Sequence, residues 1–211
     1  MEIKRSEGEK SKGEIYKMNK DWYRGVVHRM FGKFGYVIRK DMPRGSTEVA
    51  MEVFGNKEVN VCEVGVLEGN NVRNILENLN VKKIYLIDPY NGYIQEEDKI
   101  NVGIKFMEKV KRKMIKNLES YKDKIVLIEE DSFKAVKRLP DDIDFIYLDA
   151  NHDYYYIKKE FELYWSKLKK GGILAGHDNN LLSVSKAALE FSKERDLNLE
   201  FKIFDWIIRK D

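Results

Sequence analysis

Apolar and polar residues alternate along this chain in two patterns, from about residue 59 onward. Short, mostly apolar runs predict buried strands, and apolar residues spaced three or four positions apart predict amphipathic helices. Strands are expected at residues 59–64, 83–88, 125–128, 143–149 and 172–178. Helices are expected at residues 71–79, 102–118, 132–138, 155–168 and 182–194. This alternation predicts an α/β fold, a doubly wound and mostly parallel sheet with helices on both faces.

The segment before the first strand has a helical pattern. Apolar residues recur at helical spacing over residues 14–34, and Ser46 is suited to cap a short helix at residues 47–54. We therefore expect residues 1–54 to form an N-terminal helical extension, a candidate substrate lid. Residues 55–211 would form the main domain.

Two stretches of the main domain lack a helical pattern. Residues 92–99 are polar and are expected to form a loop. Residues 199–209 are rich in strand-forming residues and no helix follows them, so they are expected to form a closing hairpin that turns near Asp205.

Size, charge and composition narrow the class of protein. A chain of 211 residues suffices for one α/β domain and not for two full ones. With 39 basic and 36 acidic residues, the charge is too balanced to indicate a nucleic-acid or membrane partner. Cys62 is the only cysteine, which excludes an internal disulfide, and no apolar stretch is long enough to span a bilayer. We expect a soluble, cytoplasmic protein.

The composition also bears on thermal adaptation. Charged residues make up 36% of the chain and Gln95 is the only glutamine. This usage resembles that of proteins from thermophiles. An AT-rich codon bias accounts for it equally well, so both interpretations stay open.

A candidate cofactor loop follows the first expected strand. In open α/β sheets, ligands bind at the carboxyl ends of the strands. Here Glu63 leads into a loop that contains Gly65, Glu68 and Gly69. Gly65 permits a tight turn, and Gly69 would let a ligand approach the backbone. Leu67 replaces the middle glycine of a dinucleotide loop, and the two glutamates suit a ligand with ammonium and sulfonium charges better than a pyrophosphate.

The next two strand ends are acidic as well. Asp88 ends the second strand about twenty residues beyond Gly69, where a carboxylate can accept both hydroxyls of a ribose. Asp131 and Ser132 end the third strand, where a carboxylate could reach an adenine amino group. Each has an alternative reading, because Asp88 could serve a turn and Asp131 or Ser132 could cap the following helix. Their placement on successive strand ends favours a cofactor site.

These motifs resemble a known family. The loop at residues 63–69, the Ile-Asp-Pro-Tyr end of the second strand and residues 130–133 resemble class I S-adenosylmethionine-dependent methyltransferases. Residues 144–154 and 168–178 are similar to the small-molecule O-methyltransferase branch that includes macrocin-type and CmcI-like enzymes. The resemblance covers roughly residues 58–180. It implies S-adenosylmethionine as cofactor, a Rossmann-like seven-stranded sheet, and often a divalent metal.

Methyl transfer to a hydroxyl requires removal of its proton. Asp149, Asp178 and Asn179 are oxygen ligands suited to Mg²⁺ or another divalent cation, and this set resembles the metal site of catechol-type O-methyltransferases. Alternatively, a Lys or Arg neutralises one aspartate and His177 hydrogen-bonds the other. His152 is the candidate general base, with Asp149 beside it in the catalytic group.

The expected reaction is O-methylation of a small-molecule hydroxyl, on a sugar or a phenol. The Asn/Asp-Pro-Pro-Tyr/Phe signature of amino-group methyltransferases is absent from residues 149–152, which argues against a nucleobase amine. Two other functions stay open. One is a nicotinamide-dependent oxidoreductase on the same kind of sheet, and the other is a non-catalytic, cofactor-binding protein. A homo-oligomer is also left open.

Overall fold

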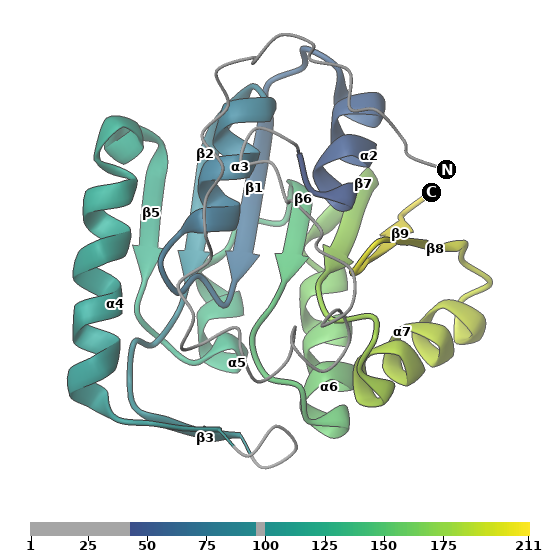
Figure 1. The fold of residues 1–211 in the computed structure, drawn as a ribbon. Helices are drawn as coiled ribbons and strands as arrows, with labels where there is room; N and C mark the ends of the chain where they lie inside the picture. The colour runs from purple at the N-terminus through teal and green to yellow at the C-terminus, as the bar shows by residue number, and fades with distance from the viewer. Residues whose placement is uncertain (1–42, 96–99) are drawn as a thin grey trace, which may run out of the picture. The chain divides into compact units, whose positions relative to one another are not determined.

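The computed structural model describes residues 43–95 and 100–211. Seven strands form one sheet, in the order β5-β2-β1-β6-β7-β9-β8 (Figure 1). The five strands from β5 to β7 are parallel, and β9 runs antiparallel between β7 and β8. The strands are β1 Val59–Val64, β2 Val81–Ile87, β5 Ile125–Ile128, β6 Ile143–Leu148, β7 Leu168–Gly176, β8 Leu199–Lys202 and β9 Asp205–Arg209. This confirms the predicted mostly parallel, seven-stranded α/β sheet with its closing hairpin.

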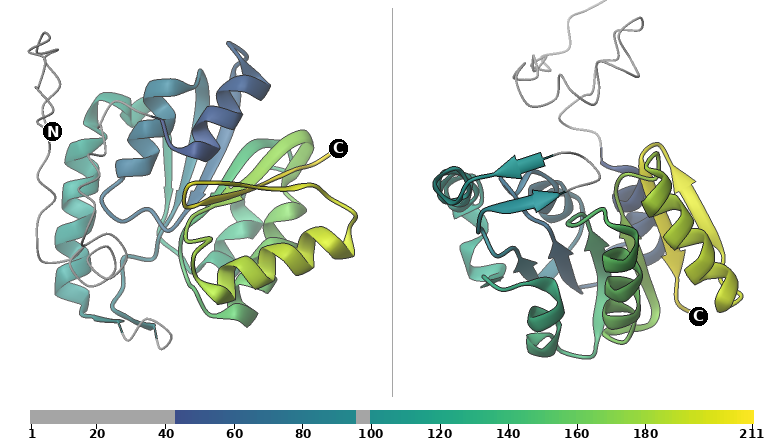
Figure 2. Two further views of the ribbon diagram at one scale, coloured as in Figure 1. Left: turned by 45° about the vertical axis from the view of Figure 1, so that its right-hand side comes forward. Right: turned by 90° about the horizontal axis from the view of Figure 1, so that it is seen from below.

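Helices cover both faces of the sheet (Figure 2). One apolar cluster packs α2, α3 and α4 on one face, and a second packs α5, α6 and α7 on the other. The helices are α2 Gly45–Phe54, α3 Asn70–Asn78, α4 Ile104–Asn117, α5 Ser132–Ala135, α6 Tyr154–Trp165 and α7 Leu182–Glu194, with 3₁₀ turns η1 Glu119–Lys124 and η2 Val136–Arg138. Among the described residues, no helix is long and apolar enough to cross a membrane.

The register of the sheet aligns the strand ends. Val64 pairs with Ile87 on one side and with Leu148 on the other, and Leu148 pairs in turn with Gly176. The residues that follow these four positions therefore emerge side by side at the lower edge of the sheet in Figure 1. Strand order reverses between β1 and β6, and ligands of open α/β sheets bind at such a point.

The stretch expected to be a polar loop contains two short strands. β3 Tyr93–Gln95 pairs antiparallel with β4 Ile100–Val102, so the prediction of an uninterrupted loop at residues 92–99 was wrong. Tyr93, Ile94 and Ile100 are aromatic or β-branched and favour strands. Three residues are too few to establish a periodic pattern, which is why the sequence did not indicate them.

Helix α2 begins differently from the prediction. Its N-cap position is Arg44, and the Ser46 side chain makes no capping bond. Instead, the backbone N–H and the hydroxyl of Ser46 both donate to Asp205 on β9, at 3.0 and 2.7 Å. A carboxylate from a distant strand thus satisfies the first turn of the helix, where donors are otherwise unpaired.

The predicted N-terminal extension is described only in part. Val49, Ala50 and Phe54 on α2 are buried in the core of the compact unit Pro43–Asp211, so this helix packs as part of the main domain. The helix predicted at residues 14–34 lies outside the described residues. A lid formed by the extension stays a prediction.

Candidate active site

The loop after β1 depends on two glycines with left-handed backbone conformations. Gly65 has φ +84°, and a Cβ there would lie 1.9 Å from the carbonyl oxygen of Asp149. Gly69 has φ +74°, and a Cβ there would lie 2.8 Å from Leu118. The smallness of Gly69 therefore allows close packing against the end of α4, and approach of a ligand to its backbone stays a prediction.

Asp88 anchors this loop. Its buried carboxylate accepts hydrogen bonds from the backbone N–H groups of Val66 at 3.1 Å, Leu67 at 3.0 Å and Tyr90 at 2.9 Å. Burial raises the pKa of Asp88, although these three bonds counteract it. The turn interpretation of Asp88 is thus present in the structure. Its contact with ribose hydroxyls stays a prediction.

Asp131 and Ser132 lie at the end of β5 as expected. Asp131 caps α5 by accepting from the N–H of Phe133 at 3.0 Å, and it also accepts from the Tyr156 hydroxyl at 2.6 Å. Ser132 is buried, and its hydroxyl donates to the Tyr156 oxygen at 3.2 Å. The capping alternative is therefore the one the structure contains, and the predicted contact with adenine stays a prediction.

An open cleft of about 350 Å³ lies beside these residues, at the ends of β2 and β5. Its lining is formed by Pro89, Asn91, Glu129, Glu130, Asp131 and Lys134. It is concave, polar and of the size of small-molecule sites.

Glu63 and Glu68 have different environments. Glu63 is buried and accepts a hydrogen bond from Asn71 at 3.1 Å, and burial raises its pKa well above the usual range. Glu68 is partly exposed and forms an ion pair with Lys113 on α4. Lys113 thus already pairs with Glu68, and contact of either glutamate with the cofactor stays a prediction.

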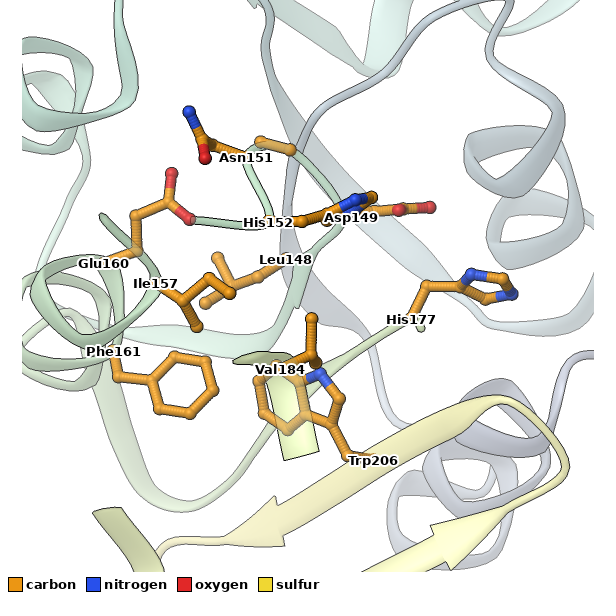
Figure 3. Close-up of a pocket in the computed structure, with 11 residues that line it drawn as sticks. Leu148, Asp149, Asn151, His152, Ile157, Glu160, Phe161, His177, Val184 and Trp206 are labelled. Atoms are coloured by element: carbon orange, nitrogen blue, oxygen red, sulfur yellow. The ribbon is translucent and has the colours of Figure 1, made fainter. Parts of the chain in front are cut away.

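Two histidines and two aspartates meet where β6 and β7 end, and Figure 3 shows three of them, Asp149, His152 and His177. His152 Nε2 lies 3.1 Å from Asp178 Oδ2, and His177 Nδ1 lies 2.9 Å from Asp178 Oδ1. Burial opposes ionisation of Asp178, but these two imidazoles outweigh it and hold its pKa well below the usual range. Burial likewise opposes protonation of His177, yet Asp178 and Asp149 raise its pKa overall.

The predicted metal ligands are only partly brought together. Asp149, His152 and Asp178 each offer a ligand atom, and these atoms lie within 4.8 Å of one another. Asn179 is directed elsewhere, because its amide donates to the carbonyls of Ile203 and Asp205 on the closing hairpin, at 3.2 and 3.0 Å. The geometry thus places an imidazole where the sequence suggested an amide.

Arg44 is a site residue that the sequence did not indicate. Its Nη1 donates to the Tyr147 hydroxyl at 2.6 Å and lies 3.7 Å from Asp149 Oδ2. Burial disfavours the charge, but Tyr147, Asp149 and other nearby acids outweigh it and hold the pKa of Arg44 above its usual range. An arginine therefore neutralises Asp149 and two histidines bind Asp178, close to the alternative arrangement considered above. Only long-range contacts bring Arg44 here, so no local motif marks it.

Glu160 on α6 is a second such residue. It lines a small cavity of about 20 Å³, room for about one water molecule, together with His152, Asn151 and apolar side chains from α6 and α7 (Figure 3). Burial raises the pKa of Glu160 to about 8. Its Oε1 is buried and forms no hydrogen bond with the described residues. The helical pattern of α6 did not reveal it, because a glutamate in a helix is usually exposed.

Comparison with known proteins identifies the family of this chain. A model of a methyltransferase-domain family matches residues 62–179. Uncharacterized protein R132 of Acanthamoeba polyphaga mimivirus is 26% identical over 125 residues, which are 59% of this chain and 53% of the relative. The chain thus spans about half the length of this curated relative.

Solved structures share the fold. Cofactor-bound Rv0187 from MTB has a TM-score of 0.58 and 10% identity over 82% of this chain and 85% of that one. Precorrin-6y C5,15-methyltransferase from Geobacter metallireducens has a TM-score of 0.56 and 12% identity, over 78% of this chain and 87% of that one. A candidate caffeoyl-CoA O-methyltransferase from Staphylococcus aureus has a TM-score of 0.54 and 15% identity, over 89% of this chain and 90% of that one. At these identities the similarity concerns the fold, and it confirms the expected Rossmann-like fold of class I methyltransferases.

Proposed function

Because the chain belongs to this family of methyltransferase domains, we propose that it transfers the methyl group of S-adenosylmethionine to the hydroxyl of a small molecule. The observation that carries the hydroxyl assignment is the group formed by His152, Asp149 and Asp178 at the ends of β6 and β7. Transfer from a sulfonium is an in-line displacement, so the protein has to align donor and acceptor and take up one proton.

The cofactor suits the edge where β5, β2, β1 and β6 end. The cleft of about 350 Å³ at the ends of β2 and β5 has the size of a small-molecule site, and carboxylates in its lining, such as Glu129 and Asp131, could accept from ribose hydroxyls or the adenine amino group. At the ends of β1 and β6, the buried Glu63 and the half-buried Asp149 offer carboxyl groups to the ammonium and the sulfonium, whose positive charges would favour the ionised form of Glu63. When bound, the cofactor supplies the electrophilic methyl group. Asp88 keeps the glycine loop beneath it in one conformation.

His152 is the proposed base. His152 Nε2 lies 3.1 Å from Asp178 Oδ2, so a proton on Nε2 would be stabilised by that carboxylate and the lone pair would then be on Nδ1. An imidazole oriented in this way by a carboxylate can accept the proton of an acceptor hydroxyl. Asp178 then stabilises the imidazolium, because the pKa of its carboxyl is held low enough for it to stay ionised.

A divalent metal is a second candidate device at the same place. Two carboxylates and an imidazole, with ligand atoms within 4.8 Å, fit an ion such as Mn²⁺ in ligand type and separation. Asp149, His152 and Asp178 would hold it, and it would lower the pKa of the acceptor hydroxyl. Arg44 beside Asp149 opposes a second cation there, so we place the metal after the histidine as the agent of proton removal.

Exposed apolar side chains favour a phenol over a sugar as acceptor. Among the described residues, three large hydrophobic side chains are at least 80% exposed: Tyr155 at 85%, Ile203 at 82% and Leu182 at 80%. They belong to the first turns of α6 and α7 and to the hairpin between β8 and β9, all at the edge where β6 and β7 end. An aromatic acceptor could pack against these side chains and remove their apolar surface from water, whereas a sugar would leave that surface solvated.

The cofactor assignment is tested by titration calorimetry of the purified chain. We expect S-adenosylhomocysteine to bind and NAD to give no signal. Binding of NAD alone would contradict the proposal and favour the oxidoreductase alternative. Binding of S-adenosylhomocysteine without turnover on any hydroxyl would favour the non-catalytic alternative.

A chelator distinguishes the two candidate agents of proton removal, His152 and a divalent metal. Turnover that persists in EDTA would support His152 as the base. Turnover that is lost in EDTA and restored by Mg²⁺ or Mn²⁺ would support the metal.

A further inference from the structure

Arg44 has donors that the protein does not use. A guanidinium offers five N–H groups. Across residues 43–95 and 100–211, the Arg44 side chain makes one hydrogen bond, from Nη1 to Tyr147, and none from Nε or Nη2. Its side chain is 33% exposed although acidic groups surround it. Part of the guanidinium is therefore available to a ligand at the ends of β1 and β6.

The position of Arg44 is fixed from several directions. Its backbone N–H donates to Asn74 Oδ1 on α3 at 3.2 Å. The helix that follows it is tied to β9 through Ser46 and Asp205. Tyr147, which accepts from Nη1, donates in turn to Asp205 at 2.9 Å. A cation held in this way loses little entropy when it binds an anion.

The charges at this end of the site match one part of the cofactor. The amino-acid end of S-adenosylmethionine carries an ammonium and a carboxylate. Glu63, Asp149 and Asp205 are the acids near Arg44. Asp205 already accepts hydrogen bonds from Ser46 and Tyr147, so Glu63 and Asp149 are the two that suit the ammonium. The carboxylate requires a positive group, and an arginine can bind it with two parallel hydrogen bonds.

The spacing of the strands is consistent with this arrangement. The cleft suited to adenosine lies at β2 and β5, and Arg44 lies at β6. Three strand intervals separate β5 from β6, roughly 14 Å. A molecule with adenosine at one end and an amino acid at the other can span that distance. We infer that Arg44 binds the carboxylate of the amino-acid portion of S-adenosylmethionine.

This inference rests on the proposed function, and a pair of ligands tests it. S-adenosylhomocysteine and its decarboxylated analogue differ only in the carboxylate. In calorimetry, the wild-type chain should bind S-adenosylhomocysteine at least about 10-fold more tightly than the analogue. Arg44→Gln should lower the affinity for S-adenosylhomocysteine by about 10- to 100-fold. The cationic analogue should bind equally well or more tightly, because a neighbouring positive charge has been removed.

Two further variants make the result decisive. Arg44→Lys keeps the charge and loses the planar fork, so it should retain an intermediate preference even if Arg44→Gln fails to fold. Arg195→Gln removes an arginine at the far end of α7, paired with Glu162, and should leave the preference unchanged. Equal binding of both ligands by the wild type, or equal weakening of both by Arg44→Gln, would overturn the inference. A wild type that binds neither ligand would overturn the proposed function itself.

Discussion

Ser46 and Asp205 are 159 positions apart in the chain, yet one carboxylate oxygen of Asp205 accepts both the backbone N–H and the hydroxyl of Ser46. The other oxygen accepts from Tyr147 at 2.9 Å. Because Tyr147 also accepts from Arg44, the same network holds α2 on the sheet and Arg44 at the strand ends. Folding and site geometry are linked through these four residues.

Asp205→Ala should therefore destabilise the domain by about 3 kcal/mol, since three donors lose a buried acceptor. Ser46→Ala removes one of the three bonds and should cost about 1 kcal/mol. Urea denaturation monitored by circular dichroism measures both. An exposed carboxylate provides the control, Asp141→Ala, which should have little effect. A loss for Asp205→Ala no larger than for this control would contradict the account.

Gly65→Ala should damage the glycine loop. Its Cβ would overlap the Asp149 carbonyl, and the left-handed φ is strained for alanine. We expect a loss of at least about 2 kcal/mol in unfolding free energy, together with weaker S-adenosylhomocysteine binding. Gly55→Ala is the matched control, with φ +53° and no atom within 4 Å of the added Cβ. If the two variants behave alike, the close approach of Asp149 is unimportant.

Glu160 should make stability depend on pH. Its folded-state pKa is about 8 because it is buried, and the ordinary value of a glutamate is 4.5. The folded state therefore holds its proton more tightly than the unfolded state. Its contribution is constant below about pH 4.5, and stability then falls as the pH rises towards 8, by at most about 5 kcal/mol.

Glu160→Gln should flatten that dependence and raise stability at pH 9. Denaturation midpoints measured between pH 5 and 9 provide the readout. Glu162→Gln, on the exposed side of the same helix, should keep the wild-type profile. A profile for Glu160→Gln that follows the wild type would show that another group titrates.

The edge of the sheet where the site lies could be predicted from the sequence, because buried parallel strands alternate with helices and end in Glu63, Asp88 and Asp149. The hydrogen-bond partners of those side chains could not be predicted from the sequence. Asp88 bonds backbone N–H groups of the glycine loop, and Asn179 turns to the hairpin. Local sequence reveals that an acid follows a strand, whereas its partner depends on packing between distant segments.

Arg44 and Glu160 show the same limit from the opposite direction. A charged residue before a helix, or within one, has the pattern of a surface residue. Burial by other parts of the chain gives each its role: Tyr147 and Asp149 surround Arg44, and Glu160 faces a cavity beside His152.

The exposed apolar residues should affect acceptor binding alone. Leu182→Ser and Ile203→Asn remove apolar surface, and asparagine tolerates the φ of +57° at position 203. We expect KM for a phenolic acceptor to rise by about 10-fold with each change, with kcat and S-adenosylhomocysteine affinity unchanged. Leu189→Ser, further along α7, is the control. An unchanged KM for the phenol would count against an apolar acceptor.

The most direct test of the whole account is transfer of labelled methyl from S-adenosylmethionine to a panel of phenols and sugars, by the wild type and His152→Gln. The account predicts that the label appears on oxygen. It also predicts that His152→Gln lowers turnover by about 100-fold or more, because the base is lost, while S-adenosylhomocysteine binds as before. Label found on nitrogen or carbon, or full turnover by His152→Gln, would contradict it.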